Sequence, residues 1–154
     1  EDIVAAEGGA MVKTANGAVL CAFDSAASAA RAAVTLRQEL NAAPRMSHPR
    51  PTGGSESDLH AAAESLDVHI VVHQGPAVAA TIDGRLDYFG QTVESALDLC
   101  AFGTTNEVLL STEVAEDPHV IADLSGAGHT LALFILDNRG TSAVRVLTAY
   151  ERSA

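Results

Sequence analysis

A two-residue turn near the N-terminus constrains the fold most. Asn16-Gly17 stands between the short apolar runs 10–13 and 18–23. Asn-Gly between such runs is the strongest short-range hairpin signal, because both residues tolerate a positive φ in a type I′ turn. Ser25 follows at a helix N-cap position, and the apolar spacing after it predicts a helix to about Asn41. The N-terminal part of the chain is therefore predicted to contain a β-hairpin that leads into a long helix.

The remaining elements are predicted from apolar runs and from Gly or Pro punctuation. Gly8-Gly9 ends a helix over 1–7, and a Pro-, Gly- and Ser-rich stretch predicts a mobile loop over 43–58. The other predicted elements are a short helix over 59–66, a strand over 68–73 with its hairpin partner at 77–82 across 74–76, a helix over 90–102, a strand over 107–110, a helical turn over 112–116 that ends near Pro118, and a last hairpin formed by 129–136 and 143–150.

Length and composition limit the class of protein. The chain has 154 residues, of which 47% are hydrophobic, mostly Ala and Val. This amount is enough for one domain with a single core, and Ala-rich helices with Val-rich strands indicate an α/β or α+β layered fold. No internal repeat and no linker divides the chain.

Charge and cysteine usage exclude several partners. The net charge of −11 argues against binding to nucleic acid or to an anionic membrane, because both need a basic surface. Cys21 and Cys100 lie in apolar runs and are expected to be free, buried thiols. With no cysteine framework, signal peptide or membrane-spanning run, a cytoplasmic location is expected.

Five ordered motifs together resemble one known family. They are Glu7-Gly8-Gly9-Ala10-Met11-Val12-Lys13-Thr14, Ala22-Phe23-Asp24-Ser25, Val68-His69-Ile70-Val71-Val72-His73-Gln74-Gly75-Pro76, Asp87-Tyr88-Phe89-Gly90-Gln91-Thr92-Val93 and Glu107-Val108-Leu109-Leu110-Ser111. In this order they resemble the catalytic domain of class III adenylate and guanylate cyclases, over nearly the whole chain apart from the Pro-rich loop.

The resemblance implies a fold and an assembly. It implies an α+β sandwich with a mixed, mostly antiparallel central sheet flanked by helices, of the ferredoxin-like palm type. Residues 1–154 would form one cyclase homology domain that lacks the family's N-terminal strand and helix. The family works as a head-to-tail dimer with nucleotide sites at the interface, so a homodimer or heterodimer is expected.

The family's metal position is not occupied by an acid in this chain. Members of the family hold two metal ions through two Asp residues, one of them at the hairpin tip and the other on the upstream strand, and hard Mg²⁺ or Mn²⁺ prefers carboxylate oxygens. An ungapped alignment places Gly17 at the hairpin-tip position, and a shift of one residue places Asn16 there. No metal cofactor is therefore expected, unless an upstream strand supplies ligands for Mg²⁺ or Mn²⁺.

The phosphate-binding helix of the family is also altered. Where the family has Asn and, four residues later, Arg, this chain has Glu94 and Asp98. The spacing places both acids on one helix face, where they would repel a triphosphate. No catalytic residue is expected, because the family's catalytic positions are occupied by Gly17, Glu94 and Asp98. The alternative is that Glu94 and Asp98 belong to an ordinary solvated helix face.

Lys13 and Asp87 match the positions at which the family recognises the purine. Lysine donates and aspartate accepts hydrogen bonds, so the pair suits adenine better than guanine. The alternative is that they are ordinary polar residues that pair with each other. The six histidines give no metal site, because His69 and His73 share a strand face about 13 Å apart.

Three functions remain open. The first is a non-catalytic cyclase homology domain, a pseudoenzyme that acts as a dimerisation or regulatory module in bacterial signal transduction. The second is a sensor that binds ATP or another adenine nucleotide without turnover. The third is an adenylate cyclase subunit, which converts ATP to cyclic AMP when a partner supplies metal and phosphate chemistry.

Overall fold

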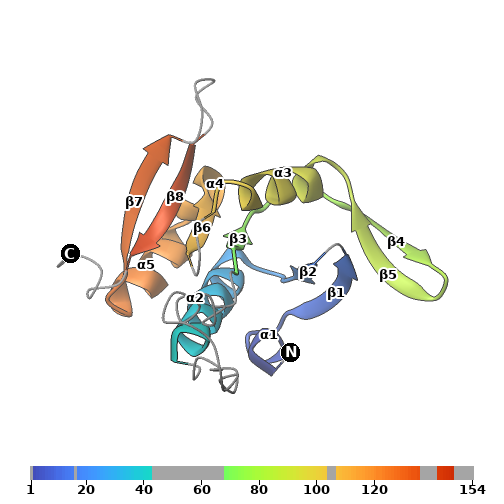
Figure 1. Ribbon diagram of the computed structural model, residues 1–154, viewed down its shortest axis with the longest axis horizontal. Helices are drawn as coiled ribbons and strands as arrows, with labels where there is room; N and C mark the ends of the chain where they lie inside the picture. Colours follow the sequence, from blue (N-terminus) through green and yellow to red (C-terminus); the bar gives the residue numbers. More distant parts are fainter. Residues whose placement is uncertain (1, 16, 43–67, 104–106, 136–141, 148–154) are drawn as a thin grey trace, which may run out of the picture.

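The computed structural model describes residues 2–15, 17–42, 68–103, 107–135 and 142–147 (Figure 1). Its helices are interspersed with single strands and strand pairs, which fits the predicted α/β or α+β layered fold. They are α1 (Asp2–Ala6), β1 (Ala10–Ala15), β2 (Ala18–Ala22), α2 (Ala26–Ala42), β3 (Ile70–Val72), β4 (Val78–Ile82), β5 (Arg85–Phe89), α3 (Gln91–Cys100), β6 (Val108–Ser111), α4 (Thr112–Ala115), α5 (Pro118–Gly126), β7 (Thr130–Ile135) and β8 (Ser142–Leu147).

A four-stranded sheet forms the centre, in the order β3-β6-β8-β7. β3 runs parallel to β6, whereas β6 with β8 and β8 with β7 are antiparallel. Every residue of β6 is buried, as expected for a strand that is apolar throughout and covered on both faces. The predicted mixed, mostly antiparallel sheet flanked by helices is confirmed.

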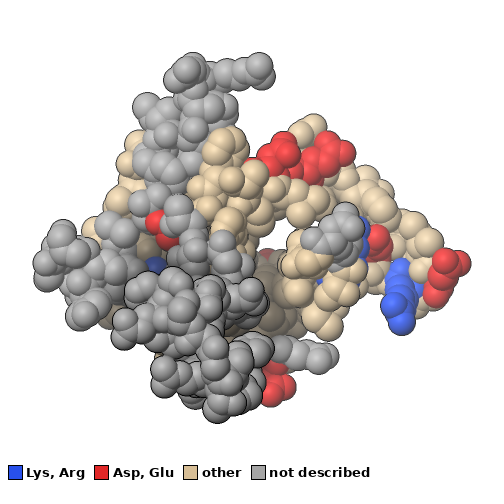
Figure 2. Space-filling model, viewed as in Figure 1, with Lys and Arg blue, Asp and Glu red and all other residues tan. Residues whose placement is uncertain are grey.

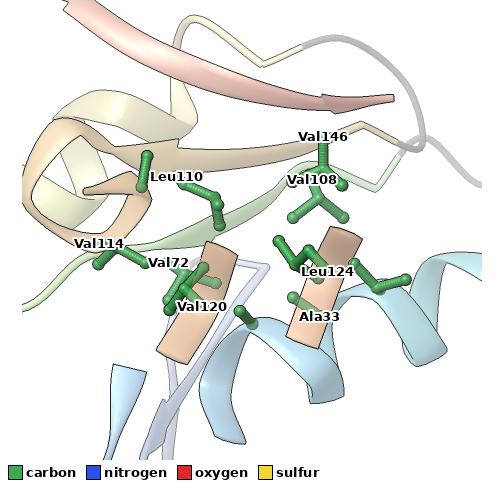
Figure 3. Packing of buried hydrophobic residues seen from close by; sticks show 11 residues of the cluster. Ala33, Val72, Val108, Leu110, Val114, Val120, Leu124 and Val146 are labelled. Carbon is green, nitrogen blue, oxygen red and sulfur yellow. The ribbon is translucent and has the colours of Figure 1, made fainter. Parts of the chain in front are cut away.

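The core lies between this sheet and the helices α2 and α5 (Figure 3). The sheet contributes Val72, Val108, Leu110 and Val146, and α5 contributes Val120 and Leu124. The buried residues of α2 are mostly alanines, whose small side chains let the helix lie close to the sheet. Each large aliphatic side chain that is fully buried stabilises the fold by about 1.5–3 kcal/mol.

Helix α2 begins and is anchored as its sequence indicates. The backbone N–H of Ser28 donates to Ser25 Oγ at 3.1 Å, which confirms Ser25 as the N-cap. Further along the helix, the buried Arg37 donates from Nη1 to the carbonyl oxygen of Val146 at 2.8 Å. This bond attaches α2 to β8 in the central sheet.

Two hairpins lie apart from the central sheet in Figure 1. In the first, β1 pairs with β2 up to Ala15 opposite Ala18, and Gly17 in the turn has φ of 80°. In the second, β4 pairs with β5 across Asp83 and Gly84, which have φ of 51° and 76°. Positive φ at both positions is the type I′ geometry that matches strand twist.

The pairing predicted for 68–73 is wrong. Strand β3 lies parallel to β6, and 77–82 instead pairs with β5, which was not predicted. The local signal for the true hairpin is Asp83-Gly84, a dipeptide that favours type I′ turns. Gln74 to Pro76 is thus a connection between two separate sheets.

The helical turn predicted over 112–116 is confirmed as α4, which ends at Ala115, but the helix that follows it, α5, was not predicted. Pro118 begins α5, and the side chain of Asp117 accepts a hydrogen bond from the backbone N–H of His119 at 2.8 Å. Proline suits the first turn of a helix, where its missing N–H costs nothing. The loop predicted over 43–58, the helix over 59–66 and the end of the last strand at 148–150 lie outside the described residues.

Candidate functional site

Lys13 and Asp87 lie in different hairpins and meet. Lys13 Nζ in β1 is 2.8 Å from Asp87 Oδ1 and 3.0 Å from Oδ2 in β5. Asp87 Oδ1 also accepts the backbone N–H of Tyr88 at 2.7 Å. The structure thus brings together the two residues that the sequence singled out for purine recognition, and it pairs them with each other.

Phe89 completes this cluster, and sequence reasoning missed it. It lies two residues after Asp87 on β5, so the two side chains share a face of the strand. The ammonium group of Lys13 lies 5.2 Å from the centre of the Phe89 ring, which is within the range of a cation–π interaction. The signal that could have found it is the Asp83-Gly84 turn, which sets the register of β5.

The ion pair changes the acidity of Asp87. The hydrogen bond from Lys13 lowers the pKa of the Asp87 carboxyl, and the N–H of Tyr88 contributes in the same direction. Because the folded-state pKa is lowered, the pair contributes stability above the ordinary pKa of aspartate and loses it as the pH falls through the lowered value. Both side chains are partly exposed, at 36% for Lys13 and 23% for Asp87, so solvent screens the pair.

A cleft of about 580 Å³ lies beside the cluster, between β1 and the outer half of the β4–β5 hairpin. Its walls combine apolar and charged side chains. They are Val12, Lys13, Thr14, Ile82, Asp83, Arg85, Leu86 and Asp87. The charged lining residues are one lysine, one arginine and two aspartates, so the cleft offers both hydrogen-bond donors and acceptors.

The face of α3 carries acids without a described partner. Glu94 and Asp98 are both exposed, and Figure 2 shows the acidic side chains gathered over α3. Among the residues that the structure describes, neither carboxylate lies in an ion pair with a Lys, Arg or His. This surface attracts cations and repels phosphate groups.

The start of α3 is positioned by the loop before β4. Thr92 Oγ1 donates to the carbonyl oxygen of Pro76 at 2.6 Å. A Cβ added at Gly75 would lie 2.6 Å from Thr92 Oγ1, so only glycine allows this approach. Two of the motifs on which the resemblance depends, 68–76 and 87–93, are therefore in direct contact.

Gly17, the described residue in the turn of the first hairpin, has no charged side chain. Gly17 is exposed, and its φ of 80° favours glycine. Asn16, the other candidate for the metal position, lies outside the described residues. Among the described residues no group of three or more His, Cys, Asp or Glu side chains is placed to bind a metal ion. These residues do not fit a two-metal centre, which needs several carboxylate oxygens.

The histidines singled out by the sequence have separate surroundings. His69 Nδ1 is 3.0 Å from the carbonyl oxygen of Cys100. His73 Nδ1 is 3.9 Å from Glu113 Oε2, and the His73 side chain is largely buried. A hydrogen bond from its own backbone N–H, with a smaller contribution from His73, lowers the pKa of Glu113.

Both cysteines are free and half-buried. Burial raises the pKa of the Cys21 thiol and of the Cys100 thiol. Since the thiolate is the nucleophile, a raised pKa makes both groups less reactive than an exposed cysteine.

The fold was compared with known proteins. No family model matches the chain, and no curated protein matches it in sequence. Among solved structures, the guanylyl cyclase domain of a rhodopsin fusion protein from the fungus Blastocladiella emersonii, in a monomeric crystal structure, has a TM-score of 0.66 at 19% identity, with 96% of this chain and 74% of that chain covered.

Two further structures agree. An adenylate cyclase from Trypanosoma brucei in its monomeric state has a TM-score of 0.66 at 13% identity, covering 94% of this chain and 73% of the other. An adenylate/guanylate cyclase/hydrolase from Silicibacter pomeroyi has a TM-score of 0.55 at 22% identity, covering 94% and 74%. The chain thus has the fold of class III cyclase catalytic domains, which is the fold that its sequence motifs predict.

Proposed function

We propose that this chain is a non-catalytic cyclase homology domain, which acts as a dimerisation or regulatory module in the cytoplasm in bacterial signal transduction. The observation that supports it most is the charge of the α3 face. Glu94 and Asp98 are exposed, and they stand at the positions where the cyclase family that this chain resembles has Asn and Arg. An arginine there would stabilise the charge that develops on the transferring phosphate, and an aspartate opposes it.

The metal position supports the same proposal. Gly17 has no side chain that could bind Mg²⁺ or Mn²⁺. Activation of a ribose hydroxyl by two metal ions needs carboxylates at both metals. Metal binding remains a proposal for a longer chain in which an upstream strand supplies ligands.

The β4–β5 hairpin supports association with a second chain. It is an isolated two-stranded sheet among the described residues, and such hairpins are marginally stable alone in water. Its large apolar side chains are exposed, with Val78 at 65% and Leu86 at 52%. Burial of these side chains against a partner would remove apolar surface from water and stabilise the hairpin.

This part of the proposal predicts concentration-dependent dimers in light scattering. Leu86→Asp and Val78→Asp are each expected to weaken association by at least about 10-fold, because a buried charge replaces an apolar contact. Leu133→Asp is the matched control, since Leu133 in β7 is 68% exposed and β7 lies on the opposite side of the molecule in Figure 1.

The control is expected to leave the dimer unchanged. A protein that stays strictly monomeric at high concentration would contradict the dimerisation part of the proposal. Equal weakening by all three variants would show that the β4–β5 hairpin is not the association surface.

A second function is favoured by a separate observation. Lys13 and Asp87 lie together at the edge of the cleft, where one can donate and the other can accept hydrogen bonds. This supports a sensor that binds an adenine nucleotide without turnover.

No described helix is long and apolar enough to cross a membrane.

A further inference from the structure

We propose that the Lys13–Asp87 ion pair, with Phe89 beside the ammonium group, is a clasp that fixes the β4–β5 hairpin against the β1–β2 hairpin. The inference rests on the proposed function only in treating the β4–β5 hairpin as the association surface. The clasp would set where that surface lies, and any ligand that takes Lys13 or Asp87 as its own partner would have to open it.

The geometry joins the two hairpins through one cationic side chain. Lys13 Nζ contacts both carboxylate oxygens of Asp87 at 2.8 and 3.0 Å, and it lies 5.2 Å from the Phe89 ring centre. Lys13 belongs to β1, whereas Asp87 and Phe89 belong to β5. The ammonium group therefore makes two electrostatic contacts across the boundary between two separate sheets.

The hairpin depends on such a contact because little else covers it. Strand β4 pairs only with β5 among the described strands. Most side chains of both strands are exposed, including Ile82 and Leu86. The charged groups that face the same cleft are Asp83 and Arg85 at the tip, beyond the clasp itself. A hairpin of this kind is expected to open locally without unfolding the core.

Hydrogen exchange on the whole protein tests the clasp. In Lys13→Met and in Asp87→Asn, the amides of residues 78–82 and 85–89 are expected to exchange about 3- to 10-fold faster than in the wild type, which is the size of one partly exposed ion pair with a cation–π contact. Adding Asp87→Asn to Lys13→Met is expected to add nothing, because Lys13→Met alone removes both the ion pair and the cation–π contact. Asp87→Asn alone leaves Lys13 beside Phe89 and is expected to have the smaller of the two effects. Amides in α2 and β6 should exchange as in the wild type.

Arg85→Met is the matched control. It removes a cation from the same cleft and the same hairpin but leaves Lys13 and Asp87 paired, so the hairpin amides should exchange at wild-type rates. Unchanged exchange in Lys13→Met would overturn the clasp, as would faster exchange that extends equally to α2 and β6. Exchange reports on the clasp and light scattering reports on the association surface, so the two proposals can fail independently.

Discussion

The double variant Glu94→Asn with Asp98→Arg is expected to bind ATP at least about 100-fold more tightly than the wild type. We expect this face of α3 to lie toward the triphosphate, because the resemblance to the cyclase family implies it. Two like charges about 4 Å apart at an effective dielectric constant near 20 cost roughly 4 kcal/mol, and exposure to salt reduces this figure. Removing two exposed acids and adding an arginine reverses the sign of the interaction.

Calorimetry with ATP and Mg²⁺ at low ionic strength measures this change. The matched control is Glu39→Asn with Asp24→Arg, two exposed acids of which Glu39 lies in α2 and Asp24 directly precedes its N-cap residue Ser25. Both double variants remove two negative charges and add one positive charge, so a general effect of net charge would appear equally in both. Equal ATP affinity of the two double variants would show that the α3 face does not lie toward the phosphates.

Leu110→Ala is expected to lower the free energy of unfolding by about 3–5 kcal/mol. Leu110 in β6 is 0% exposed and belongs to the core between the central sheet and the helices (Figure 3). Truncation removes buried methyl groups and leaves a cavity that the sheet cannot close. A domain of this size has a total stability of about 5–15 kcal/mol, so this loss is a large share of it.

Urea unfolding followed by circular dichroism measures the loss. Leu133→Ala makes the same chemical change at an exposed position of β7 and is expected to cost less than about 0.5 kcal/mol. A cost at Leu110 as small as that at Leu133 would contradict the core described here.

Local chemistry made a large part of the fold predictable. Asn16-Gly17 indicated the first hairpin and Ser25 indicated the start of α2, because turn and cap preferences depend on a few neighbouring residues. The partner of β3 was not predictable in this way. It pairs with β6, which lies beyond β4, β5 and α3 in the chain, and apolar strands carry little information about which distant strand they join.

The candidate site was predictable only in part. Motif resemblance singled out Lys13 and Asp87, which the structure pairs. It did not indicate Phe89 or the cleft wall at Ile82 and Leu86, because these depend on the register of the β4–β5 hairpin. The Asp83-Gly84 turn fixes that register, and it is a local signal that lies outside the five family motifs.

The third open function is a cyclase subunit that is active only with a partner chain, and it predicts a different experimental result. Such a subunit would form cyclic AMP only when mixed with a chain that supplies metal ligands and an arginine at the phosphate. The present chain offers Gly17, Glu94 and Asp98 at the matching positions. A homodimer would repeat these losses in each site.

Incubation of the purified protein with ATP or GTP and Mn²⁺, followed by detection of cyclic nucleotides, tests the central claim most directly. A cyclase fold without a carboxylate at Gly17 and with acids at 94 and 98 should form no cyclic AMP or cyclic GMP above a protein-free control. Cyclic nucleotide that forms with the wild type and disappears with Asp87→Ala would contradict the claim.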